Sequence, residues 1–159
     1  MSSRKRILGL ALGVALALAG AEAVAAGGHS HDGHAADAIE LKLNDGKKWQ
    51  TDAPLQKGME EIRRALAASI DKIHHDKASR AEYVALADSI ERQVDYITHN
   101  CKLPEDADAE LHVVIGQVLD GVETMREGGD PKAGAVKVVE ALDAYGDYFD
   151  HPGWQKLAH

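Results

Sequence analysis

The sequence predicts an all-α protein: an antiparallel, up-down-up-down four-helix bundle that follows a cleaved signal peptide and a short extended N-terminal segment. Four observations lead to this prediction. An apolar run lies behind basic residues at the start of the chain, and four later stretches repeat apolar residues every three or four positions. Proline, glycine and aspartate separate those stretches, and the length of 159 residues suits a single domain.

Residues 1–26 have the three regions of a secretory signal peptide. Basic residues at 4–6 precede an apolar run at 7–19, and small residues at 23–26 offer a cleavage site. The run is too short to span a bilayer comfortably. We therefore expect cleavage near Ala26 and a location in the periplasm or outside the cell. Loss of three basic residues and one acidic residue takes the formal net charge from −8 to −10.

The acidic charge of the mature chain narrows the classes of partner. A negative protein without a basic stripe is repelled by nucleic acid and by anionic membranes, so we expect neither as a partner after the signal is removed. No nucleophile motif or glycine-rich phosphate loop occurs, which argues against an enzyme. Cys101 is the only cysteine, so it cannot form a disulfide within the chain.

Two short segments separate the signal from the helices. Residues 27–37 consist of Gly, His, Ser, Ala and Asp without apolar periodicity, which predicts a flexible, histidine-rich leader. Residues 38–50 alternate apolar and polar side chains and contain an Asn-Asp-Gly turn sequence at 44–46. This pattern predicts an extended segment or a loose hairpin.

The remaining residues, 51–159, form the predicted bundle. A capping aspartate followed by proline starts the first helix, and a Gly-Gly pair ends the third. The first apolar stripe consists of Leu55, Met59, Ile62, Leu66, Ile70 and Ile73. The spacing of three and four residues along such a stripe is typical of one helix face. The predicted helices cover about 51–76, 78–100, 105–126 and 130–150.

Alternating helix directions bring sulfur and imidazole groups to one pole of the predicted bundle, where the first and third helices start and the second and fourth end. The candidate metal ligands at this pole are Met59, His99, Cys101, His112 and His151. Thioether, thiolate and imidazole groups together suit copper, and zinc would use the cysteine and the histidines. Each side chain also has an ordinary structural explanation, as core packing, helix capping or exposure to solvent.

The leader contains a second group of candidate ligands, His29, His31 and His34. Cleavage after Ala26 would leave His29 third from the new N-terminus. There the free amine, two amide nitrogens and the imidazole can enclose Cu(II) in a square plane. Cleavage before Ala26 would remove this geometry. The alternative is a soluble spacer whose histidines bind nothing.

Two details resemble the cytochrome b562-like class of exported four-helix proteins: Met59 in the segment KGMEEIRRAL, and the sequence DAYGDY at 143–148. The resemblance is architectural and covers about residues 51–150. It implies haem b held between an early methionine and a histidine of the last helix. Gly146 stands at the position of that histidine, and the nearest candidate is His151. No CxxCH sequence occurs, which excludes covalent c-type haem.

These observations lead to three hypotheses. The first is an exported metal-binding protein that buffers or delivers copper, with another exported metal-handling protein as partner in the case of delivery. The alternative is a b-type haem electron carrier of the cytochrome b562-like class, ligated by Met59 and either His151 or His112. A further alternative is an interaction or stress module without a cofactor.

Overall fold

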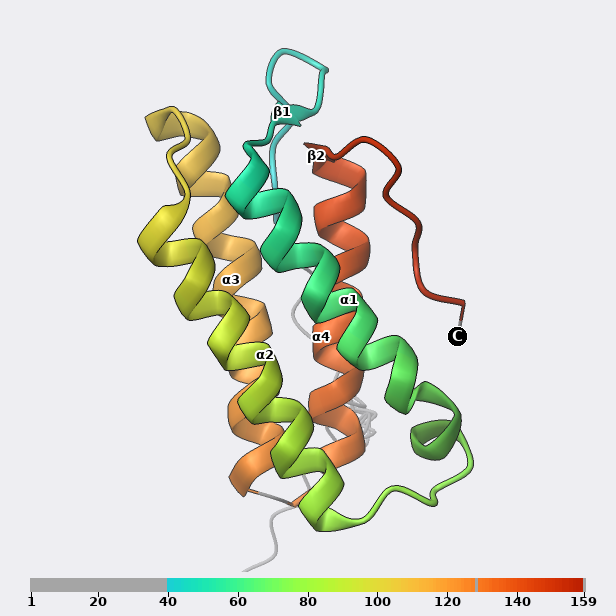
Figure 1. The fold of residues 1–159 in the computed structure, drawn as a ribbon. Coiled ribbons are helices and arrows are strands. Elements are labelled where there is room, and N and C mark those ends of the chain that lie inside the picture. The colour runs from blue at the N-terminus through green and yellow to red at the C-terminus, as the bar shows by residue number, and fades with distance from the viewer. Residues whose placement is uncertain (1–39, 128, 159) are drawn as a thin grey trace, which may run out of the picture. The chain divides into compact units, whose positions relative to one another are not determined.

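The computed structural model describes residues 40–127 and 129–158 and folds them as a four-helix bundle (Figure 1). The helices are α1 (Ala53–His74), α2 (Arg80–Asn100), α3 (Glu105–Glu127) and α4 (Pro131–Tyr148). Successive helices run in opposite directions, so the predicted all-α, up-down-up-down bundle is confirmed. The predicted signal peptide and histidine-rich leader lie outside the described residues.

Side-chain caps define the starts of three helices. Asp52 accepts a hydrogen bond from the Leu55 N–H at 2.9 Å, and Asp130 caps α4 in the same way. Ser79 and Glu82 form a reciprocal capping box at the start of α2. Each cap supplies an acceptor to a first-turn N–H group that has no partner within the helix. The extended backbone of Ser79 starts α2 two residues after the predicted boundary.

The predicted apolar stripes meet in one core. Leu55, Met59 and Ile62 of α1 are 0% exposed, and they pack with the buried faces of the other helices. Among the described residues, none of the polar or charged ones is buried to this degree. The opposite faces of the helices carry charged side chains, and no helix within the described ranges is long and apolar enough to cross a membrane. Polar groups that could bind a ligand therefore lie at the rim of the core.

Neighbouring helices pack at different distances from one another. Gly121 of α3 and Gly134 of α4 face each other, and a Cβ atom on either would lie 2.6 Å from the carbonyl oxygen of the other. The absence of side chains at these positions allows the close approach of α3 and α4. By contrast, α1 and α4 are the least extensively packed adjacent pair, and a cavity of about 310 Å³ lies between them.

The N-terminal segment ties the start of the bundle to its end. A turn closes between Asn44 and Lys47 through two backbone hydrogen bonds of 2.8 and 2.9 Å, as the turn sequence at 44–46 predicts. Strand β1 (Trp49–Gln50) then pairs in parallel with β2 (Phe149–Asp150), which directly follows α4. The sequence does not predict this pairing across 100 residues. It holds the start of α1 beside the end of α4.

Candidate functional site

The predicted gathering of helix ends at one pole is present in the structure. The start of α1, the end of α2, the start of α3 and the end of α4 all lie at the pole that also holds β1 and β2 (Figure 1). The candidate ligands of the bundle occupy four different environments: a cavity between α2 and α3, the exposed end of α2, the aromatic contacts after α4 and, for Met59, the core.

Cys101 closes α2 and is half-buried. Its N–H group donates to the Ile97 carbonyl at 2.8 Å. The Asp52 carboxylate accepts a hydrogen bond from the N–H group of the next residue, Lys102, at 2.7 Å. Burial, followed by the negative charge of Asp52, raises the pKa of the Cys101 thiol to about 12. The free thiol is therefore protonated and unreactive at neutral pH.

His112 shares a surface cavity with Cys101. The cavity has a volume of about 200 Å³ and is lined by Ile97, Thr98, Cys101, Asp108, Leu111, His112 and Ile115. The His112 Nδ1 atom lies 2.8 Å from the Asp108 carbonyl oxygen and 3.4 Å from its carboxylate. Donation of the Nδ1 proton to this carbonyl leaves the lone pair on Nε2, the arrangement that metal-ligating histidines use. The side chain is 74% exposed, so solvent reaches the ring.

His99 is exposed near the end of α2. Its Nδ1 atom lies 2.7 Å from the Asp95 carbonyl, four residues earlier. His75, at the opposite pole, makes the same contact with the Asp71 carbonyl at 2.7 Å. Histidines at both poles thus make the same local hydrogen bond to the carbonyl four residues earlier, so this bond does not by itself indicate a ligand site. What distinguishes His112 is the cavity that it shares with Cys101.

Met59 and His151 are held by packing instead. Met59 is 0% exposed in the core, in agreement with its position on the apolar stripe. The His151 Nδ1 atom lies 3.0 Å from the Tyr145 hydroxyl, and the ring packs against Trp154 with centroids 5.0 Å apart. Burial lowers the pKa of His151 below the ordinary histidine value. The neutral ring is thus engaged with its aromatic neighbours.

Gly146 is the position at which the cytochrome b562-like resemblance implies a haem ligand. A Cβ atom there would lie 2.5 Å from the indole Nε1 of Trp154. The indole therefore occupies the space that a side chain at this position would need, and the glycine is required for packing of the C-terminal segment.

The described part of the chain was searched for clusters of possible metal ligands. Within residues 40–127 and 129–158, no group of three or more His, Cys, Asp or Glu side chains lies in an arrangement that could hold a metal ion. The Cys101–His112 cavity combines a sulfur and an imidazole from different helices. The leader histidines His29, His31 and His34 lie outside the described residues.

Two residues matter at this pole that the sequence did not mark as part of a site. Asp52 caps α1, yet it also accepts a hydrogen bond from the Lys102 N–H, and its negative charge raises the pKa of the Cys101 thiol. Tyr145 reads as a core aromatic residue, yet its buried hydroxyl binds His151. The Asp52 contact joins residues 50 positions apart, and the Tyr145 contact joins residues 6 positions apart. Both depend on where the side chains point in the folded chain, so no local sequence pattern predicts them.

Comparison with known proteins found no similar protein. No protein-family model, curated protein or solved structure matches the chain. The function is therefore argued from the residues of the site itself.

Proposed function

We propose that this protein binds a soft metal ion, Cu(I) above others, in the cavity between α2 and α3, and that it buffers or delivers copper in an exported compartment. The observation that carries the proposal is the placement of Cys101 and His112 on the lining of one cavity of about 200 Å³. Thiolate and imidazole are the two protein ligands that soft and borderline ions prefer. The two residues come from the end of α2 and the first turns of α3.

The number of ligands favours Cu(I) over zinc. Structural zinc sites are tetrahedral and take four protein ligands, whereas Cu(I) accepts two or three. A pair formed by Cys101 Sγ and His112 Nε2 meets the smaller requirement. The hydrogen bond from His112 Nδ1 to the Asp108 carbonyl fixes the ring orientation and supports Nε2 as the ligand.

The surroundings of the thiol suit reversible binding. The Cys101 thiol is protonated when free, because burial and the Asp52 carboxylate raise its pKa, so a metal ion must displace this proton. The exposed His112 ring gives an ion or a partner protein direct access. In this proposal the leader histidines His29, His31 and His34 capture ions and raise their concentration near the bundle.

Competition with a chromophoric Cu(I) chelator under anaerobic conditions tests the site. Cys101→Ser and His112→Gln should each weaken binding by at least tenfold, ~1.4 kcal/mol. His75→Gln is the matched control, because His75 has the same backbone hydrogen bond at the opposite pole, and it should leave the affinity unchanged. Unchanged affinity in Cys101→Ser would refute the bundle site. Removal of residues 27–37 separates binding by the leader from binding by the bundle.

Haem b binding is the weaker proposal for the same pole. Met59 is fully enclosed by the core, and Trp154 fills the space beside Gly146, so a haem would have to displace existing packing. Reconstitution with haem and a Soret band would favour the haem hypothesis. Absence of both stoichiometric copper and haem binding would favour the third hypothesis, an interaction or stress module without a cofactor.

A further inference from the structure

The C-terminal segment, residues 151–158, turns back from the end of α4 and runs along the bundle (Figure 1). Besides His151, the side chains of Trp154, Lys156 and Leu157 attach it. Trp154 packs edge-on against Tyr145 with ring centroids 4.9 Å apart, and Leu157 is 9% exposed. Lys156 forms an exposed ion pair of 2.8 Å with Asp147. These contacts are few, so local opening of the segment costs less than unfolding of the helices.

His151 lies where this segment begins and touches two of its anchoring rings. Its Nδ1 atom lies 3.0 Å from the hydroxyl of Tyr145, whose side chain is 0% exposed. The centroid of its ring lies 5.0 Å from that of Trp154. The backbone N–H of Trp154 donates a hydrogen bond to the His151 carbonyl at 3.0 Å. Burial raises the pKa of Tyr145, so the hydroxyl keeps its proton at neutral pH. It can donate this proton to Nδ1 when the neutral imidazole carries its own proton on Nε2.

The charged groups around His151 come from α1. Glu60 attracts a proton to the ring and Arg63 opposes it, while Glu60 and Arg63 are themselves paired at 2.7 Å. On the α4 side the neighbour is the neutral Tyr145 hydroxyl. Burial is the largest influence and lowers the pKa of His151 below 6.5. The docked segment is therefore stable above pH 6.5, and its docking weakens as the pH falls toward and below the lowered pKa.

We propose that protonation of His151 releases residues 151–158 from the bundle while the four helices remain folded. The added proton places a charge on a half-buried ring against the buried Tyr145 side chain, and it converts the Nδ1 acceptor of the Tyr145 hydroxyl into a donor. The hydroxyl then loses its acceptor, and the segment gains solvation by leaving. This inference is independent of the proposed copper site, whose ligands are Cys101 and His112.

Fluorescence of Trp154 in the full chain tests the release. Trp49→Phe leaves Trp154 as the only tryptophan. As the pH falls from 8 to 5, the emission of Trp154 should shift to the red, and its indole ring should become more accessible to quenching by acrylamide. The midpoint of this transition should lie below pH 6.5. Far-UV circular dichroism should stay constant over this range, because the helices do not unfold.

Two substitutions connect the transition to His151. His151→Gln keeps a side-chain acceptor for Tyr145 but cannot gain a proton, so the fluorescence transition should disappear. His75→Gln, at the opposite pole, should retain it. If His151→Gln folds poorly, Tyr145→Phe should move the midpoint upward toward 6.5, because the neutral ring loses its hydrogen bond. Persistence of the transition in His151→Gln, an unmoved midpoint in Tyr145→Phe, or loss of helical signal at the same pH would overturn the proposal.

Discussion

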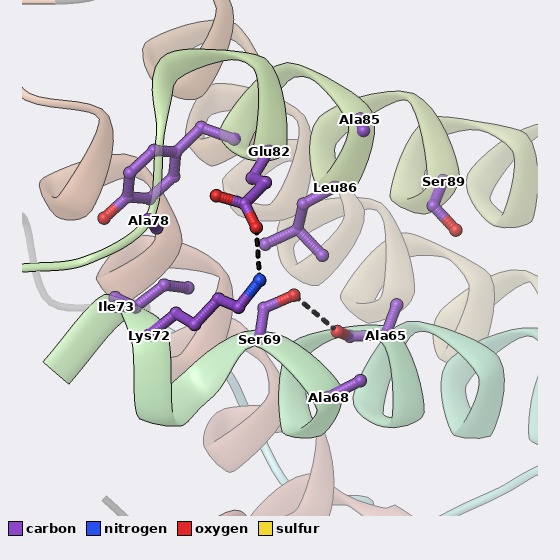
Figure 2. A pocket seen from close by; sticks show the side chains of 11 residues that line it. Ala65, Ala68, Ser69, Lys72, Ile73, Ala78, Glu82, Ala85, Leu86 and Ser89 are labelled. Carbon is purple, nitrogen blue, oxygen red and sulfur yellow. Dashed lines mark hydrogen bonds and ion pairs between the residues drawn. The ribbon is translucent and has the colours of Figure 1, made fainter. Parts of the chain in front are cut away.

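Two cavities at opposite poles of the bundle differ in size and in chemistry. At the pole opposite the proposed metal site, a cavity of about 310 Å³ lies between α1 and α2. Figure 2 shows that small side chains create much of it, and that Lys72 and Glu82 form an ion pair across it. Its small lining residues are Ala65, Ala68, Ser69, Ala78, Ala85 and Ser89.

The smaller cavity is the better candidate for a metal site. The larger one has no cysteine or histidine among its lining residues, whereas the cavity of about 200 Å³ has both Cys101 and His112. A soft metal ion is recognised by its ligand atoms, not by the volume around them. The comparison shows that the chemistry of the lining distinguishes these two cavities. The poles also differ in their tertiary contacts, because β1 pairs with β2 at the pole of the proposed site and the C-terminal segment starts there.

Substitution of a glycine should give the largest difference in the free energy of unfolding between the two poles. Gly146→Ala places a Cβ against Trp154 and should lower the free energy of unfolding by about 1–3 kcal/mol, as overpacking does. Gly129→Ala, toward the opposite pole, meets no atom within 4 Å and should change it by less than about 0.5 kcal/mol. Urea unfolding measures both variants. Equal effects would show that Trp154 yields without cost.

Loss of a helix cap should give the next largest difference. Asp52→Ala removes the acceptor for both Leu55 and Lys102 N–H groups and should cost about 1–2 kcal/mol. Ser79→Ala removes a more exposed cap and should cost about 0.5–1 kcal/mol. Thermal unfolding under matched conditions compares them. A larger cost for Ser79→Ala would contradict the view that the pole at Asp52 is more tightly connected.

The smallest effect is expected at the exposed ion pair of the larger cavity. Lys72 and the Ser79 cap lower the pKa of Glu82 from 4.5 to about 2. The stabilisation from this shift is therefore present above pH 4.5 and is lost as the pH falls toward 2. Lys72→Met should raise the pKa of Glu82 toward 4.5, which an NMR titration of its carboxyl carbon measures. Lys132→Met, which acts on Asp76, should leave Glu82 unchanged.

Much of the fold was predictable because its signals are local. The three-and-four spacing of Leu55, Met59 and Ile62 predicts a buried helix face, and all three are enclosed. The candidate site was less predictable. Helix direction places its residues at one pole, but the rotation of each helix about its axis decides which side chains meet. Cys101 and His112 line one cavity, whereas Met59 points into the core and His151 contacts Tyr145.

Apolar period, helix caps and connection lengths act over neighbouring residues, and they are enough to predict the four helices, their order and the pole at which their candidate ligands collect. Three features appear only in the folded chain: the pairing of β1 with β2, the hydrogen bond from the Lys102 N–H to Asp52, and the packing of Trp154 into the space beside Gly146. These contacts join distant parts of the chain. They depend on how side chains fill a shared volume, which no single segment specifies.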